Sequence, residues 1–265
     1  MSYKTLLYEK KGKIAYITLN RPERFNAFDS VMRAELPRLW AEFENDDGAW
    51  IAVLTGAGDK AFCTGMDVRE AATAGPAKPG SGDDQRVRLT PYDCHVSKPV
   101  IVAVNGACAG GGLIFVADAD IVLCSDSAYF TDARVSVGIV SIQGTVTLTR
   151  RIPLESVLRL ALMGKSERMS PQRAYQIGLV SQVVPQKDLM TSANEVAEKI
   201  VANSPICVVR SKKAIWQGLD SGMTKALENA WAILQSHRGH PDNVEGPKAF
   251  NEKRAPNWSY RKTNV

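Results

Sequence analysis

The chain has 265 residues, of which 45% are hydrophobic, and lysine plus arginine exceed the acidic residues by 33 to 28. A formal charge of +5 is too weak and too dispersed to predict binding to nucleic acid, although it favours a phosphate-bearing ligand. The five cysteines show no Cys-x-x-Cys or Cys/His ligand spacing, which argues against disulfides and structural zinc. The chain has neither a long apolar stretch nor a signal-peptide-like start, so we expect a cytoplasmic protein that does not insert into membranes.

Short apolar runs with the length and composition of β-strands recur along the first half of the chain. They lie at residues 14–19, 50–54, 100–104 and 121–123, with a weaker run at 128–131. Helical patterns separate them. This alternation predicts an α/β core in which helices cover a sheet.

Helix signals follow the same order. Asp29 and Ser30 are placed to cap a helix over residues 31–43, and the segment after Gly112 is expected to be helical to about Ala119. Ser170 followed by Pro171 has the form of a helix cap with proline at the first helical position. Beyond it the chain reads as mostly helical, including a segment at 189–202 and longer segments after Pro205.

Residues 73–84 are rich in glycine and proline, which excludes a continuous helix or a central strand there. Two interpretations stay open for this stretch. It is a lid over a neighbouring site around residues 62–67, or it is a disordered loop without a function.

Residues 98–115 run from a buried strand into three consecutive glycines, Gly110–Gly112, and then into an apolar helix start. Glycine backbone can approach a ligand closely, and a helix N-terminus carries about half a unit of positive charge. The pattern therefore predicts backbone N–H groups that stabilise a carbonyl oxygen as it becomes negative.

Taken together, several segments resemble the enoyl-CoA hydratase/isomerase superfamily, also called the crotonase superfamily, over essentially the whole chain. The segments that carry the resemblance are residues 20–27, 54–67, 98–112, 119–121, 164–166, 178–185 and 245–256. The resemblance implies an α/β fold, a crotonase-type spiral of ββα turns over residues 1–200, which binds acyl-CoA. It also implies a C-terminal helical trimerisation region over residues 201–265, and hence a homotrimer or homohexamer.

The resemblance implies an acyl-CoA thioester as the partner, no metal, and no cofactor beyond the coenzyme A of the substrate. The backbone N–H groups of Met66 and Gly111 would hold the thioester oxygen. The residues matching the coenzyme A contacts of the family are Arg24, Ala27, Ala61, Cys63, Thr64 and Arg69, with Phe250 and Lys253 approaching from the C-terminal region of the same or a neighbouring subunit.

The sequence departs from the hydratases of this family at two positions. They use two glutamates to position and deprotonate water, and the matching residues here are Ile114 and Arg134. Isoleucine cannot accept a proton, and arginine stays protonated at any accessible pH. Neither residue can act as the general base.

Three aspartates are candidate replacements. Asp132 lies two residues before Arg134 and shares its face if the segment is extended, so it is the first choice. Asp118 lies one helical turn after Ile114, at a distance that puts it beyond reach of the substrate. Asp67 follows Met66, where an aspartate is common in the family and structural. For each acid, a cap, a turn or an ion pair is the alternative role.

Arg134 itself has two interpretations: it clamps a carboxylate of the substrate, or it is a chemically silent ion-pair partner of Asp132. Ser141 and Gln143 replace residues of a glycine-rich stretch of the hydratases and can hold a water or a polar acyl group. His95 lies shortly before the central strand and is a weaker candidate base, since it has no partner motif.

These observations leave three hypotheses. The first is an acyl-CoA-transforming enzyme, a hydratase, isomerase, hydrolase or related lyase with non-standard acid/base residues. The second is a catalytically silent protein of the same fold that binds CoA thioesters or serves as a scaffold. The third, a nucleotide-dependent dehydrogenase, rests on Gly56-Ala-Gly58 and is weak, because Ala61 stands where a third glycine belongs and no acidic ribose ligand follows.

Overall fold

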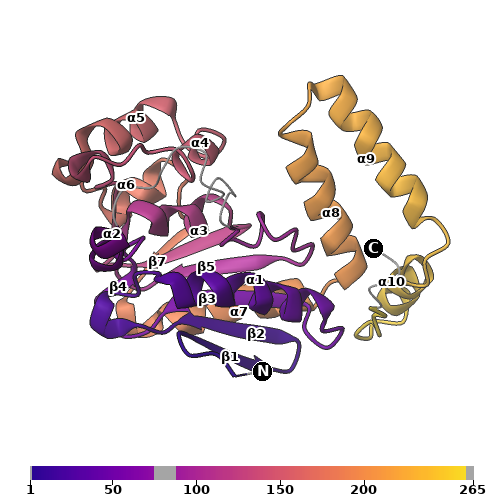
Figure 1. Ribbon diagram of the computed structural model, residues 1–265. Coiled ribbons are helices and arrows are strands. Elements are labelled where there is room, and N and C mark those ends of the chain that lie inside the picture. Colours follow the sequence, from indigo (N-terminus) through magenta and orange to yellow (C-terminus); the bar gives the residue numbers. More distant parts are fainter. Residues whose placement is uncertain (1, 75–87, 261–265) are drawn as a thin grey trace.

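The computed structural model describes residues 2–74 and 88–260, in which two β-sheets are wound together with helices (Figure 1). The larger sheet has six strands in the order β1 (Leu6–Lys11), β2 (Ile14–Leu19), β3 (Ile51–Gly56), β5 (Val100–Val104), β7 (Ile121–Ser125) and β9 (Gln182–Val184). Only β1 and β2 pair antiparallel, and the other pairs are parallel. Parallel pairs need crossover connections, which the helices provide.

The smaller sheet is also parallel. Its three strands, in spatial order, are β4 (Ala61–Cys63), β6 (Ala107–Ala109) and β8 (Tyr129–Thr131). Each turn of the chain adds one strand to each sheet and then a helix: α2 (Val68–Ala74), α3 (Leu113–Ala117) or α4 (Thr145–Leu148). This repeat is the expected spiral of ββα turns. The predicted lid at 73–84 falls almost entirely outside the described residues, and α2 reaches Ala74.

The first long helix, α1 (Ser30–Asn45), begins where the sequence predicts it. The Asp29 carboxylate accepts a hydrogen bond from the Met32 N–H at 2.8 Å, and this cap starts the helix. The helix buries Leu36, Trp40 and Phe43, which lie one turn apart on one face. Three further helices of the spiral are α5 (Leu154–Met163), α6 (Pro171–Gln176) and α7 (Leu189–Val201). Ser170 caps α6 as predicted, its hydroxyl accepting from the Arg173 N–H.

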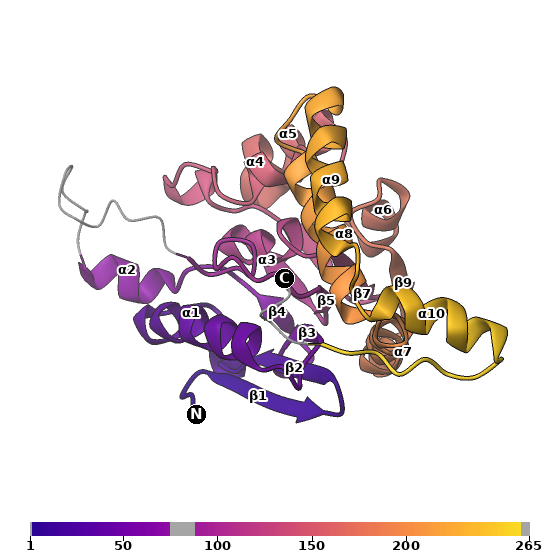
Figure 2. The ribbon, with the colours of Figure 1, turned by 90° about the vertical axis from the view of Figure 1, so that its right-hand side faces the viewer.

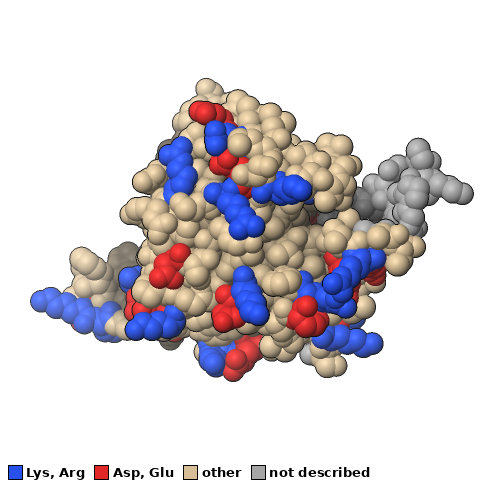
Figure 3. All heavy atoms as spheres, turned by 90° about the vertical axis from the view of Figure 1, so that its left-hand side faces the viewer, with Lys and Arg blue, Asp and Glu red and all other residues tan. Residues whose placement is uncertain are grey.

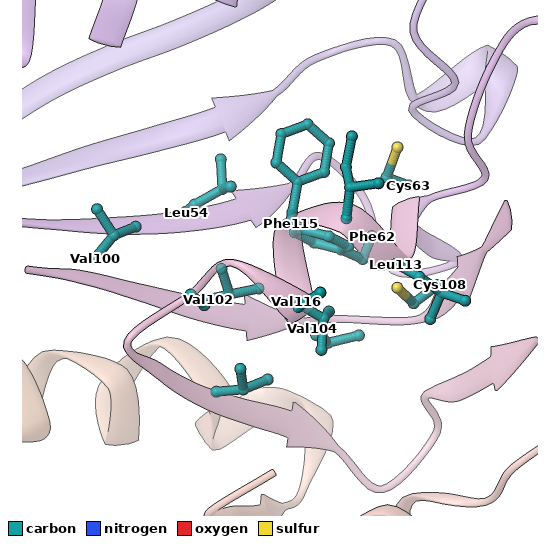
Figure 4. Close-up of a cluster of buried hydrophobic side chains, with 14 of the residues drawn as sticks. Leu54, Phe62, Cys63, Val100, Val102, Val104, Cys108, Leu113, Phe115 and Val116 are labelled. Atoms are coloured by element: carbon teal, nitrogen blue, oxygen red, sulfur yellow. The ribbon is translucent and has the colours of Figure 1, made fainter. Parts of the chain in front are cut away.

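The core lies on both faces of the larger sheet. On one face, side chains such as Val53 and Ile101 pack against Ala193 and Ala197 of α7. On the other face, the strands, the smaller sheet, α1 and α3 enclose the main apolar cluster, where Phe62 and Phe115 meet edge to face (Figure 4). The closely packed smaller sheet therefore holds the loops that follow β4 and β6 in fixed positions.

The last three helices form an arm beside the spiral (Figures 1 and 2). They are α8 (Pro205–Gly218), α9 (Met223–His237) and α10 (Asp242–Asn251), with α8 and α9 packed against each other. One apolar stripe on the arm faces outward: Ile215, Met223, Leu227, Trp231 and Leu234 are between 49% and 75% exposed. The spiral ends with α7 at Val201, at the predicted boundary between the two regions, whose independence as domains stays a prediction.

The surface has no marked separation of charge on the face shown in Figure 3, where basic and acidic side chains are interspersed. Within residues 2–74 and 88–260, no helix combines the length and the apolar character that crossing a bilayer requires.

Candidate active site

A cavity of about 420 Å³ opens between the loops that follow β4 and β6 and the segment 133–143. One wall is made of backbone at Met66, Gly110 and Gly111. The other carries Arg134 and Gln143 beside an aliphatic surface of residues 137–142. The cavity thus combines a backbone wall, a polar wall and an apolar floor, which is the usual composition of a small-molecule site.

Glycine packing brings the two backbone loops together. Strands β4 and β6 are neighbours, so the turns at their ends meet. A Cβ on Gly65, where φ is +89°, would lie 2.6 Å from the Gly111 nitrogen, and a Cβ on Gly112 would lie 2.1 Å from the Cys63 carbonyl oxygen. Only glycine permits these approaches, and Met66 and Gly111 both line the one cavity.

Both of these amides are available to a ligand. The Phe28 N–H donates to the Gly65 carbonyl at 2.8 Å and the Asp67 N–H donates to the Phe28 carbonyl at 3.0 Å, which holds the Met66 loop on both sides. Among hydrogen bonds between described residues, none uses the Met66 N–H. Gly111 is the second residue of a 3₁₀ turn, Gly110–Gly112, and the first amides of a helical turn have no acceptor within it.

The opposite wall is organised by an ion pair. The Arg134 guanidinium donates from Nε to Asp132 Oδ1 at 2.8 Å and from Nη2 to Asp132 Oδ2 at 2.7 Å. Its Nη1 donates to the Gln143 carbonyl at 2.8 Å, and the Ser141 hydroxyl donates to Asp132. Burial alone would raise the pKa of Asp132, but hydrogen bonds from Arg134 and Ser141 outweigh it and lower this pKa below its usual value.

Asp132 and Arg134 therefore have different positions relative to the cavity. The Asp132 side chain is fully buried and does not line the cavity, whereas Arg134 does. The prediction that Asp132 presents its carboxylate to the substrate therefore differs from the structure, because both of its oxygens accept hydrogen bonds from Arg134 and Ser141. The predicted ion pair between the two residues is present.

Gln143 is oriented by a residue that the sequence did not single out. Its Nε2 donates to Asp93 Oδ2 at 2.7 Å, and Asp93 is only 7% exposed. An ionised carboxylate accepts hydrogen bonds and cannot donate them, so the amide oxygen of Gln143 points away from Asp93. Arg33 of α1, which lines the cavity, is another residue that sequence reasoning missed; neither Asp93 nor Arg33 belongs to a motif that would have revealed it.

The remaining candidate bases lie elsewhere. Asp67 forms an ion pair with Arg21 at 3.1 Å, in line with a structural role, and Asp118 accepts from the Thr90 hydroxyl at 2.6 Å. His95 lines a separate cavity of about 300 Å³. Among the described residues that line the active-site cavity, the titratable side chains are therefore those of Arg33 and Arg134.

The residues predicted to contact coenzyme A divide into two groups. Thr64 and Arg69 lie just before and just after Met66, and Thr64 lines the cavity. Arg24 ends the 3₁₀ turn Pro22–Arg24, next to Phe25, whose carbonyl accepts a hydrogen bond from the Thr64 N–H. Ala27, Ala61 and Cys63 are buried.

Phe250 and Lys253 form the second group. They lie in and just after α10, on the opposite side of the molecule from α2 (Figures 1 and 2). A single chain therefore does not bring them to the cavity. Phe250 is 84% exposed.

The ββα spiral and the paired glycine turns define a protein of the crotonase superfamily. The profile of the family described as enoyl-CoA hydratase/isomerase matches residues 9–261. The chain is 35% identical to (E)-benzylidenesuccinyl-CoA hydratase of Thauera aromatica, over 94% of this chain and 96% of that protein. It is 34% identical to short-chain-enoyl-CoA hydratase of Clostridium acetobutylicum, over 96% of this chain and 97% of that protein.

Among solved structures, an enoyl-CoA hydratase/isomerase from Mycobacterium paratuberculosis superposes with a TM-score of 0.91, at 40% identity over 98% of this chain and 100% of that chain. The chain therefore belongs to the enoyl-CoA hydratase/isomerase family, a family of acyl-CoA-transforming enzymes with the crotonase fold. The dehydrogenase hypothesis is wrong: the Gly56–Gly58 segment leads into strand β4, where a dinucleotide-binding turn would lead into a helix.

Proposed function

We propose that the protein stabilises an enolate of an acyl-CoA thioester between the backbone N–H groups of Met66 and Gly111, and that no carboxylate among the described residues lining the cavity serves as the general base. One observation carries this proposal. The cavity that contains both amides has Arg33 and Arg134 as the titratable side chains among its described lining residues. The cavity thus has the two residues whose backbone N–H groups would bind the thioester oxygen, but its described lining has no carboxylate in place of the two glutamates of the hydratases.

The backbone half explains binding and activation of the thioester. Two preorganised N–H donors meet the oxygen as negative charge develops on it, and the loss of one such donor costs about 3–4 kcal/mol of transition-state stabilisation. The donors belong to packed turns, so they need no rearrangement when the charge forms. The aliphatic residues 137–142 would exclude water from the acyl group and strengthen this interaction.

The polar wall indicates the kind of acyl group. Arg134 keeps its charge and is held in place by Asp132, so it can donate hydrogen bonds to an oxygen of the substrate but cannot remove a proton. The amide oxygen of Gln143 supplies an acceptor on the same wall. This pair fits an acyl group with a hydroxyl, carbonyl or carboxylate near the reacting carbons. The succinyl group in the name of the Thauera relative carries such a carboxylate.

The same observation supports a second candidate, a protein that binds acyl-CoA and catalyses nothing, since a cavity without a carboxylate base is also what the loss of catalysis produces. Exchange at the carbon next to the thioester separates the two. The purified protein is incubated in D2O with saturated, 2-enoyl, 3-hydroxy and dicarboxylic acyl-CoA compounds, and NMR follows α-deuteration while chromatography follows products.

Turnover of the oxygen-bearing acyl groups would support the proposed enzyme. Tight binding without turnover or exchange of any compound would support the silent protein. Absence of binding to every compound in calorimetry would contradict both.

We further propose that the protein assembles as a homotrimer or homohexamer. The outward stripe of α8 and α9 is apolar and includes Trp231, and such surfaces on a single chain mark contacts with other chains. In such an assembly, Phe250 and Lys253 of a neighbouring chain would contact the coenzyme A bound in this chain, because its own Phe250 and Lys253 lie too far from the cavity. Light scattering after size exclusion tests this proposal: a mass of one chain at micromolar concentration would contradict it.

A further inference from the structure

A cysteine and a histidine meet at the base of the arm, far in sequence from the active-site cavity. Cys207 is the third residue of α8, and His237 is the last residue of α9. The sulfur of Cys207 lies 3.2 Å from His237 Nε2, within hydrogen-bond distance. His240 stacks on His237 with the ring centroids 5.0 Å apart.

The other four cysteines are in different surroundings. Cys63, Cys108 and Cys124 are buried among apolar side chains, and burial raises the pKa of each thiol. Cys94 is half-buried, and burial raises its pKa to about 11. All five cysteines lie in the described part of the chain, and among them Cys207 is the one whose sulfur lies within hydrogen-bond distance of a histidine.

Two features of the fold bear on proton transfer from Cys207 to His237. Ser204 caps α8, and its hydroxyl oxygen accepts from the Cys207 N–H, which places the sulfur beside the positive end of a 14-residue helix. Burial, followed by the charge of Arg210 and the neighbouring His240, lowers the pKa of His237 below its usual value. A neutral His237 can therefore accept the proton of the thiol through Nε2.

The cysteine is also accessible. Cys207 is half-buried and lines a cavity of about 540 Å³ between α8 and the end of the larger sheet. Aliphatic side chains dominate the wall of this cavity, among them Ile121, Ile200, Val208 and Ile215. A small reagent with an apolar tail fits this space better than a charged one.

We propose that Cys207 is a nucleophilic thiol that adds to α,β-unsaturated carbonyl compounds in this cavity, with His237 as its base. The thiol proton moves to His237 Nε2, and the sulfur forms a bond to the β-carbon. The electron pair of the C=C bond shifts to the α-carbon, which then takes the proton back from His237. The addition has no leaving group and requires no oxidant.

The test uses the intact wild-type protein and N-ethylmaleimide, followed by trans-2-hexenal, each at limiting concentration. Mass spectrometry of proteolytic peptides gives the rate of modification at each cysteine. We expect Cys207 to react at least about tenfold faster than Cys94, its half-buried counterpart without a histidine partner. Equal or slower reaction at Cys207 would overturn the proposal, whether the cause is low reactivity or coverage by another chain.

Two histidine variants test which residue accepts the proton of the Cys207 thiol. His237→Gln should reduce the rate at Cys207 to about that of Cys94, whereas His240→Gln, which leaves the Cys207 contact in place, should keep Cys207 the faster of the two. An unchanged rate in a His237→Gln protein with the wild-type melting temperature would refute the role of His237. If His237→Gln does not fold, the ratio of Cys207 to Cys94 in the wild-type protein decides the proposal.

Discussion

The two walls of the active-site cavity are built in different ways. The Met66 and Gly110–Gly112 wall consists of backbone whose position follows from glycine contacts between two neighbouring turns. The Asp132–Arg134 wall consists of side chains held by a buried ion pair and by hydrogen bonds from Ser141 and to Gln143. The first wall keeps its geometry only if the glycines remain, because a Cβ at these positions would collide with the neighbouring turn. The second wall can be changed by replacing single side chains.

The contrast suggests that backbone binds the thioester oxygen, whereas side chains bind the variable part of the acyl group. Backbone donors serve any thioester oxygen, because every acyl-CoA presents the same group to them. Side chains on the facing wall meet the part of the acyl group that differs between substrates. A family can therefore retain one wall and vary the reaction through the other, and Ile114 and Arg134 are such variations here.

The largest expected effect comes from crowding the backbone wall. Gly65→Ala introduces a Cβ 2.6 Å from the Gly111 nitrogen at a positive φ, so it displaces one or both amides. We expect kcat/KM for the best acyl-CoA to fall by about 10²–10³-fold. Gly178→Ala is the matched control, since φ is +81° but nothing lies within 4 Å of its Cβ, and Gly178 does not line the cavity. Similar losses in both variants would contradict the assigned role of the turns.

A smaller effect is expected in the facing wall when its ion pair is broken. Asp132→Asn leaves the Arg134 guanidinium, whose side chain is 13% exposed, without its carboxylate, and we expect the free energy of unfolding to fall by about 3–5 kcal/mol. Glu167→Gln is the control, because its partner Arg159 is 52% exposed and such pairs contribute about 1 kcal/mol or less. Urea denaturation measures both values, and equal values would show that Asp132 is not structural.

The pH dependence of the free energy of unfolding also tests the Asp132–Arg134 ion pair. The pKa of Asp132 is lowered in the folded state, so its contribution is present above the unfolded pKa of about 4 and is lost as the pH falls through the lower folded value. The difference in unfolding free energy between the wild-type protein and Asp132→Asn should be constant above about pH 5 and should narrow below about pH 4. A difference that widens with acid would contradict this sign.

The smallest expected effect concerns selectivity. Arg134→Gln keeps a polar side chain but removes the charge and the forked donors, so acyl groups with an oxygen near the reacting carbons should lose about tenfold in kcat/KM or affinity. Saturated acyl-CoA compounds should change by less than about threefold, since they offer nothing for Arg134 to bind. A uniform loss across both classes would mean that Arg134 supports the fold rather than the substrate.

Elements with a strong local signal were predictable from the sequence. Strands 14–19 and 100–104 agree with the structure to the residue, because their apolar runs are long enough to be recognised alone. The strands β6 and β9 were missed; each has three residues, too few for a periodic pattern, and neighbouring strands stabilise them. The edge strand β1 was missed because most of its side chains are exposed and polar.

Residue identity and local spacing are enough to predict the family, the glycine turns, the helix caps at Asp29 and Ser170, and the replacement of the two glutamates. They do not predict that Met66 and Gly111 share a cavity, that Asp132 is buried behind Arg134, or that Cys207 meets His237, all of which were learned from the folded structure. Such contacts join segments far apart in the chain, and they depend on how strands pair and helices pack, which local sequence does not specify.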